Sequence, residues 1–443
     1  MTSLTLAIVF AFVVGYICIA FESGLKINKA AIALLMCVGT WTLFMLDPGQ
    51  YLPGVENLTL KVGEILQEHL GETAETLFFL MGAMTIVEIV DKNGGFNFVR
   101  DMMQTTSKRK LLWRIAFMTF ILSAILDNLT TSIVMIMVLR KLVKDRADRL
   151  IYASLIIISA NSGGAFSPIG DVTTIMLWIR GMITTQGVIK EIFVPSLVSM
   201  VIPALILQYS LKGELQMQGK DSSKTSSELF TKRQRNTIFV CGVGGLMFVP
   251  VFRYLTGLPP FMGILLILGL LWAVTEIFYR SKKAGRDDFS RRVSHLLANI
   301  DMSTIMFFLG ILMAVGCLQE VGVLTALGEG LDQMSGGNHY LVTGVIGVLS
   351  SIVDNVPLVA GCMGMYPIAE AGDLAVDGIF WQLLAYCAGV GGSMLIIGSA
   401  AGVVVMGLEK ITFGWYMRRI TWIVFLGYIA GMASYWLLDT FVL

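Results

Sequence analysis

The sequence predicts an all-α polytopic membrane protein with about ten full spans, two re-entrant helical hairpins and two discontinuous helices, arranged as inverted-topology repeats. Three observations predict this fold class. Of the 443 residues, 56% are hydrophobic and only 14% are charged, whereas a soluble domain carries about 25% charged residues. The basic residues gather in alternate loops, and one series of motifs occurs twice. The balance of 32 basic and 31 acidic residues gives no sign of a nucleic-acid partner.

Ten apolar segments are long enough to cross a bilayer as helices, which takes about 20 residues. They are 4–21, 29–46, 72–91, 150–180, 187–210, 237–253, 260–280, 301–320, 380–408 and 420–439. The first has no basic region before it, so it is typical of a span rather than of a signal peptide.

Two further apolar segments, 111–139 and 340–366, have a polar break near the middle. Each half has about 15 residues, which is too few to cross the bilayer alone. We predict that each segment is a re-entrant hairpin; the alternative is one long distorted helix.

The distribution of basic residues supports the hairpins. If both segments turn back, 28 of the 32 basic residues lie on one side of the membrane, and loops rich in Lys and Arg stay in the cytoplasm. The other four are Lys61, Arg180, Lys190 and Arg253. We therefore predict a multi-pass protein of the cell inner (plasma) membrane with both termini extracytoplasmic. An acidic outer loop is expected around 56–75.

The elements of 72–180 recur in the same order in 301–408. The tetrapeptide LFFL at 77 matches MFFL at 306, and Asp-Asn occurs at 127 and at 354. The glycine pairs at 163 and 391 and the single glycines at 170 and 398 keep the offset between 227 and 229. One copy starts outside and the other inside, which is typical of secondary transporters with a site at the repeat interface.

This pattern divides the chain into five parts. They are N-terminal scaffold spans (1–71), repeat 1 (72–210), a cytoplasmic linker (211–236), scaffold spans (237–300) and repeat 2 (301–443).

Several kinds of chemistry lack their motifs. The sequence contains no Walker A motif, no HExxH and no GxSxG. The six cysteines lie in apolar runs without a CxxC, and the three histidines lie in polar stretches. We therefore expect neither an enzyme nor a bound cofactor. An ion channel would need a continuous polar pore, which closed hairpins do not favour.

Irregular backbone marks the candidate site. Besides the two hairpin tips, glycine-rich stretches interrupt two long spans, NSGGAFSPIGD at 161–171 and GVGGSMLIIGS at 389–399. Broken backbone at membrane depth persists only where protein or water satisfies it, and freed carbonyls, amides and hydroxyls suit a hard cation such as Na⁺. The candidate oxygen ligands are Asn128, Thr130, Thr131, Asn161, Ser167, Asn355, Ser393 and Ser399.

Three acids, Asp127, Asp171 and Asp354, lie deep in apolar segments, and we find no Lys or Arg deep in a span to neutralise them. An unpaired buried carboxylate tends to take up a proton or a cation. We predict that Asp127 and Asp354, with Asn128 and Asn355, bind Na⁺ or Li⁺ in competition with H⁺. Asp171 is a third titratable group, for which helix capping is the competing role.

These motifs resemble a known family. DNLTT at 127–131, DN at 354–355 and NSGGAFSPIGD at 161–171 are similar to the NhaD-type Na⁺/H⁺ antiporters of the ion transporter superfamily, over roughly 72–410. The resemblance implies exchange of Na⁺ or Li⁺ for H⁺, a homodimer, and elevator-like movement of a transport domain against a scaffold. The N-terminus is short for the family, so we expect an upstream segment.

The same superfamily supplies the alternative function. It contains arsenite-efflux proteins and Na⁺-coupled dicarboxylate carriers, and the dicarboxylate carriers have uncharged hairpin tips. Anion efflux or uptake of an organic acid would demand a cationic or neutral site. The acids at 127 and 354 argue against it.

Overall fold

The computed structural model describes residues 2–20, 25–96, 99, 102–211, 213–215, 230–280, 293–352 and 354–441. These residues form helices and two isolated β-bridges, without a strand. Seven helices are long and apolar enough to cross a membrane, which confirms the multi-pass helical class. They are α3 (Lys29–Leu46), α4 (Leu58–Lys92), α10 (Thr185–Leu207), α11 (Lys232–Thr256), α12 (Pro260–Arg280), α14 (Met302–Glu320) and α21 (Thr421–Phe441).

Other helices make up most of the remainder. The segments 150–180 and 380–408, predicted as broken spans, each fold as two helices, and 111–139 and 340–366 each fold as two helices that meet at the polar break. The other helices are α1 (Ser3–Ala20), α6 (Lys108–Leu126), α7 (Asn128–Leu142), α8 (Arg146–Ala165), α9 (Val172–Ile179), α13 (Val293–Leu296), α15 (Val323–Ser335), α16 (His339–Ser350), α17 (Asn355–Met365), α18 (Ile379–Gly391), α19 (Ala400–Glu409) and α20 (Phe413–Arg419). Most of the linker 211–236 lies outside the described residues.

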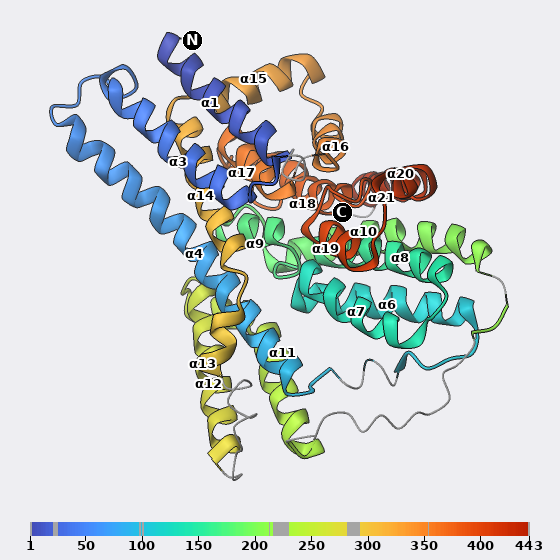
Figure 1. The fold of residues 1–443 in the computed structure, drawn as a ribbon. Helices are drawn as coiled ribbons and strands as arrows, with labels where there is room; N and C mark the ends of the chain where they lie inside the picture. The colour runs from blue at the N-terminus through green and yellow to red at the C-terminus, as the bar shows by residue number, and fades with distance from the viewer. Residues whose placement is uncertain are drawn as a thin grey trace.

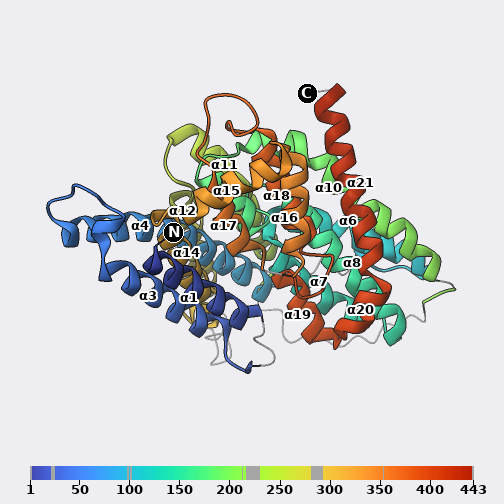
Figure 2. The ribbon, with the colours of Figure 1, turned by 90° about the horizontal axis from the view of Figure 1, so that it is seen from above.

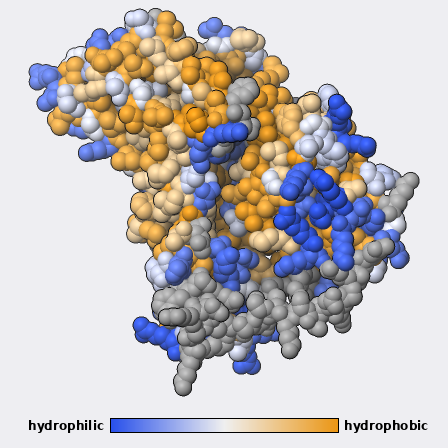
Figure 3. Space-filling model, viewed as in Figure 1, coloured by the Kyte–Doolittle hydropathy of each residue, from blue (hydrophilic) through white to orange (hydrophobic). Residues whose placement is uncertain are grey.

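The helices form two groups side by side (Figures 1 and 2). The long-helix group contains α1, α3, α4, α11, α12 and α14, and the broken-helix group contains α6–α10 and α16–α21. Helices α9 and α17 of the second group lie against α4 and α14 of the first. Figure 3 shows an apolar surface over α1, α3 and α4. Phe10 of α1 and Leu35 of α3 are 71% and 75% exposed, as expected of helices that face lipid.

Helix α4 corrects one prediction. It begins at Leu58 and contains Glu64, Glu68, Glu72 and Glu75, so these acids lie on a helix and not in a loop. The Asn57 side chain accepts a hydrogen bond from Leu60 N and starts the helix. At 35 residues the helix is about 50 Å long, well beyond the roughly 30 Å hydrocarbon core. The expected boundary between 71 and 72 therefore falls inside one continuous helix.

Glycines allow the backbones of neighbouring helices to touch. A Cβ on Gly163 of α8 would lie 2.2 Å from the carbonyl oxygen of Phe120 in α6. A Cβ on Gly391 of α18 would lie 2.2 Å from the carbonyl oxygen of Gly347 in α16. Each interrupted helix thus packs on the first helix of its neighbouring pair with no room for a side chain.

Serine hydrogen bonds repeat the same pattern. Ser123 Oγ donates to the carbonyl of Ala160 at 2.5 Å, and Ser350 Oγ donates to the carbonyl of Ala388 at 2.8 Å. The serines are 227 residues apart and the alanines 228. The offset found in the sequence therefore applies to contacts in space.

Candidate functional site

Two polar residues cap the helices that follow the interruptions. Asp171 is the N-cap of α9, and its Oδ1 accepts the backbone N–H of Thr173 at 3.0 Å and the Thr173 hydroxyl at 2.9 Å. Ser399 is the N-cap of α19 and accepts Gly402 N at 3.1 Å. These caps stand 228 residues apart, so the two halves present an acid and a hydroxyl at corresponding positions.

Asparagines from the polar breaks reach Asp171. Asn128, where α6 meets α7, donates through Nδ2 to Asp171 Oδ2 at 2.5 Å and to Asn161 Oδ1 at 3.0 Å. Asn355, where α16 meets α17, donates to Asp171 Oδ1 at 3.4 Å. Asp171 is 1% exposed. Its carboxylate is thus held by neutral donors from both pairs of helices.

Asn161 extends the network into the second interruption. Its Nδ2 donates to Ser393 Oγ at 2.8 Å and to Ser399 Oγ at 2.9 Å. These hydrogen bonds join six residues, which we call the central cluster: Asn128, Asn161, Asp171, Asn355, Ser393 and Ser399. Each of the six is at most 5% exposed. Among the described residues, no Lys or Arg forms a hydrogen bond or ion pair with Asp171.

Five other predicted residues lie outside the central cluster, and four of them, Asp127, Thr130, Thr131 and Ser167, belong to the first half of the chain. Asp127 caps α7 with φ 81°, and its carboxylate accepts Thr130 N at 2.7 Å and the Thr130 hydroxyl at 2.8 Å. Ser167 Oγ donates to the Ala124 carbonyl at 2.5 Å. In the described part of the chain, the buried Thr131 hydroxyl has no hydrogen-bond partner. Asp127 and Ser167 thus fix local backbone beside the central cluster.

Asp354 has a basic partner, so the expectation that nothing neutralises the three acids is wrong for this one. Lys29 Nζ lies 3.1 Å from Asp354 Oδ2 and 4.3 Å from the centre of the Phe307 ring. Lys29 is the first residue of α3, which packs along α14. Its position at the end of an apolar segment suggested a loop residue, but a long flexible side chain can carry the ammonium inward from there.

The four predicted metal ligands are not brought together as one set. Asn128 and Asn355 contact Asp171, whereas Asp127 binds Thr130 and Asp354 binds Lys29. Across the described ranges, no group of three or more His, Cys, Asp or Glu is arranged to hold a metal ion. Among the described acids, Asp171 is therefore the only one that accepts hydrogen bonds from both asparagines.

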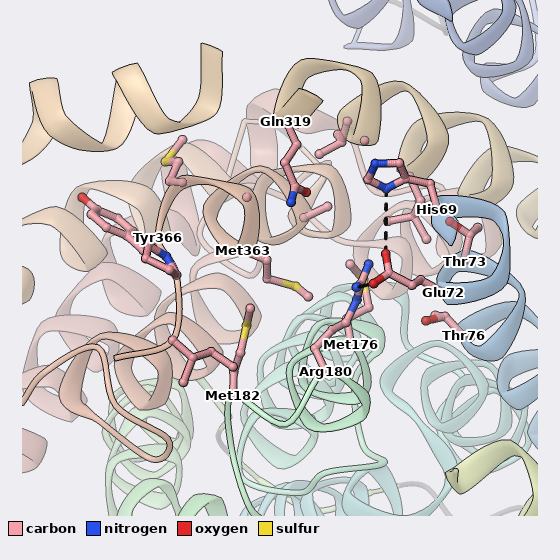
Figure 4. Close-up of a pocket in the computed structure, with 18 of the residues that line it drawn as sticks. His69, Glu72, Thr73, Thr76, Met176, Arg180, Met182, Gln319, Met363 and Tyr366 are labelled. Atoms are coloured by element: carbon pink, nitrogen blue, oxygen red, sulfur yellow. Dashed lines mark ion pairs between the residues drawn. The ribbon is translucent and has the colours of Figure 1, made fainter. Parts of the chain in front are cut away.

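A cavity of about 470 Å³ lies between the two groups of helices (Figure 4). Its walls include Met176 of α9 and Ala360 of α17. These residues follow Asp171 and Asn355 by five positions each, or about 7.5 Å along a helix axis. The cavity thus approaches the central cluster from the C-terminal ends of α9 and α17.

Charged side chains from opposite walls of the cavity form ion pairs. Glu72 of α4 forms an ion pair with Arg180 at the C-cap of α9 (Figure 4). His69 Nδ1 lies 3.8 Å from Glu72 Oε2, and His69 Nε2 lies 3.0 Å from Glu320 Oε1. Sequence reasoning missed this cluster because its members come from three separate helices. One short helix, α9, therefore carries Asp171 at its start and an ion pair to the long-helix group at its end.

Comparisons with known proteins agree on one family. The family model described as "Citrate transporter" matches residues 16–381. "Sodium/proton antiporter 1" of Arabidopsis thaliana is 45% identical over 97% of this chain and 72% of its own length. "Sodium/proton antiporter 2" of the same plant is 42% identical over 98% of this chain and 99% of its own length. "Na(+)/H(+) antiporter NhaD" of Vibrio parahaemolyticus is 31% identical over 78% of this chain and 85% of its own length.

Proposed function

Because this chain belongs to the citrate transporter family and, within it, to the NhaD-type Na⁺/H⁺ antiporters, we propose that it exchanges Na⁺ for H⁺ across a membrane. The observation that carries this proposal is the environment of Asp171. Its buried carboxylate accepts hydrogen bonds from Asn128, Asn355 and Thr173, all of them neutral. Burying an unpaired carboxylate is costly, so a proton or a small cation stabilises it, and each displaces the other.

The central cluster supplies suitable oxygen ligands. Na⁺ is a hard cation, and hard cations are bound by carboxylate, amide, hydroxyl and carbonyl oxygens. Asp171 contributes the charge, and Ser393, Ser399 and the side-chain oxygens of Asn161 and Asn355 complete the ligands. Li⁺ binds in the same way. Asp127 and Asp354 flank this site as further carboxylates that take up H⁺ or Na⁺ during exchange.

The two groups of helices suggest how access alternates. In this proposal the long-helix group is a scaffold shared by a homodimer, and the broken-helix group carries the ion across the bilayer in an elevator-like movement. The recurring glycine and serine contacts support two repeats of inverted topology, each with a re-entrant hairpin. The protein resides in the inner membrane with both termini outside and contributes to pH homeostasis.

A second candidate is transport of an organic anion such as citrate. Two observations favour it, namely the description of the matching family model and Lys29 beside Asp354. Asp171 opposes it, since an uncompensated carboxylate at the centre of the cluster repels an anion.

Proteoliposomes that contain a pH-sensitive dye separate the two candidates. We expect an imposed pH gradient to collapse on addition of NaCl or LiCl, and not on addition of choline citrate. Collapse by citrate alone would exclude the antiporter and favour the anion carrier.

Lys29 provides a test of competition for Asp354. In Lys29→Gln, Na⁺ no longer has to displace an ammonium group from Asp354. The apparent KM for Na⁺ is expected to fall about threefold to fivefold, since a partly exposed ion pair is worth up to about 1 kcal/mol. Lys26→Gln, in the segment that joins α1 to α3, is the control and should leave the KM for Na⁺ unchanged. An unchanged KM in Lys29→Gln would mean that Asp354 does not take part in Na⁺ binding.

The Glu72–Arg180 ion pair provides a test of movement between the two groups. Glu72→Arg places two like charges together, and we expect about a fivefold loss of exchange rate, from the roughly 1 kcal/mol scale of such pairs. The double variant Glu72→Arg/Arg180→Glu restores the attraction and should recover most of the rate. Glu68→Arg is the control, since Glu68 is an exposed acid on the same helix and no ion pair involves it in the described part of the chain. A double variant no better than Glu72→Arg would exclude the pair as a contact used in the cycle.

A further inference from the structure

A groove separate from the ion site lies between the start of α10 and the end of α11. Its volume is about 830 Å³, and it joins the broken-helix group to the long-helix group. Ile183, Ile189, Pro250 and Val251 form apolar walls. Tyr254, which also lines the groove, is 88% exposed. Apolar walls beside an exposed tyrosine are typical of the level where a membrane protein meets lipid head groups.

Two basic side chains line the groove. Arg253 stacks on the Trp178 ring, 4.9 Å from its centre, and donates from a terminal nitrogen to the Trp178 carbonyl at 2.5 Å. This contact holds the guanidinium at the end of α11. Lys190 is exposed one turn into α10, and no ion pair involves it in the described part of the chain. Both are among the four basic residues that the charge pattern assigns to the outer side.

Acidic groups near the groove limit where an anion can bind. Asp377 accepts Thr184 N and the Thr184 hydroxyl, each at 2.6 Å, so a carboxylate already occupies the N-terminus of α10. Glu191 points to the Tyr435 hydroxyl at 3.2 Å, and Glu75 interacts with Arg253. These carboxylates lie outside the lining, in which Lys190 and Arg253 are the charged residues among those described.

We propose that this groove binds an anionic phospholipid. The phosphate lies between Lys190 and Arg253, and the part of an acyl chain nearest the head group lies against the apolar walls. Basic pockets between membrane helices are suited to lipid head groups, and the apolar lining fits an acyl chain better than a soluble anion. The lipid contacts both groups of helices, because Lys190 belongs to one and Arg253 to the other. This binding goes beyond ion exchange and does not depend on it.

The test uses the full-length protein in detergent micelles. Unfolding temperature is measured while phosphatidylglycerol, phosphatidylcholine or inorganic phosphate is added. We expect phosphatidylglycerol to raise the unfolding temperature more than phosphatidylcholine does. Lys190→Gln should weaken the apparent phosphatidylglycerol affinity about fivefold, which corresponds to about 1 kcal/mol per basic residue. Lys61→Gln is the control, since Lys61 is exposed on the same predicted side and pairs with Glu64.

Three outcomes overturn the proposal. Equal stabilisation by phosphatidylglycerol and phosphatidylcholine would show that the head-group charge is not recognised. An unchanged affinity in Lys190→Gln would place the lipid elsewhere. A shift of the same size with inorganic phosphate would make the groove a site for a soluble anion. Arg253→Lys is a second variant, because it keeps the charge while weakening the contact with Trp178. We expect it to weaken the apparent phosphatidylglycerol affinity less than Lys190→Gln does.

Discussion

Replacement of Asp171 by Asn is expected to reduce Na⁺-driven proton movement to the level of empty vesicles while the protein stays folded. Asn is as good an N-cap as Asp, so the start of α9 survives the change. The amide cannot take up a proton or supply the charge that a cation needs. The measurement is collapse of an imposed pH gradient by NaCl in proteoliposomes, together with the unfolding temperature of the purified variant.

A second capping aspartate provides the matched control. Asp301 caps α14 through Thr304 N in the same manner, but at an exposed position. Asp301→Asn should retain exchange and folding. If Asp171→Asn transports at the normal rate, Asp171 is only a helix cap and the proposed ion site is wrong. If both variants lose activity and unfold alike, capping explains the loss.

Replacement of Gly163 by Ala is expected to destabilise the protein strongly. The added Cβ meets the carbonyl oxygen of Phe120 at 2.2 Å, and backbone cannot turn aside as a flexible side chain can. Overpacking costs about 1–3 kcal/mol, and we expect the upper end of that range. Such a loss is large beside the roughly 5–15 kcal/mol that stabilises a folded protein. The unfolding temperature and the yield of folded protein measure it.

Two further variants make this result specific. Gly391→Ala should be equally harmful, since its Cβ would meet the Gly347 carbonyl oxygen at the same distance. Gly269→Ala, within α12, has no atom within 4 Å of the new Cβ. It should be neutral or slightly stabilising, because Ala is favoured over Gly in a helix. Normal stability in Gly163→Ala would mean that α6 and α8 do not approach so closely.

Most members of the central cluster could be predicted from polar residues at irregular backbone. Asn128, Asn161, Asp171, Ser393 and Asn355 were all predicted in this way, and the structure joins them in one hydrogen-bonded cluster. The spacing of glycines at offsets near 228 also corresponds to matching contacts in space. Local rules succeed here because a broken helix at membrane depth has few ways to satisfy its polar groups.

The ion pair between Lys29 and Asp354 could not be predicted. Lys29 and Asp354 are 325 residues apart in the chain, and no local pattern indicates that they pair. Asp127 and Asp354 stand ahead of Asp171 in the sequence prediction because helix capping is the competing role for Asp171, and that ranking takes no account of Lys29. The length of α4 could not be predicted from apolar residues alone. Its first turns carry several glutamates, so the helix extends beyond the apolar segment.

The contacts made by glycine also determine where the molecule can deform. Where two backbones touch, no side chain can change its rotamer to make room. We therefore expect the pairs α6 with α8 and α16 with α18 to move little relative to each other. The cavity between the two groups is lined instead by Met176, Met182, Met363 and Met365. Methionine side chains are flexible and fill irregular spaces in several conformations. If the two groups move against each other as proposed, we expect these methionine side chains to rearrange while the close helix pairs around Asp171 keep their packing.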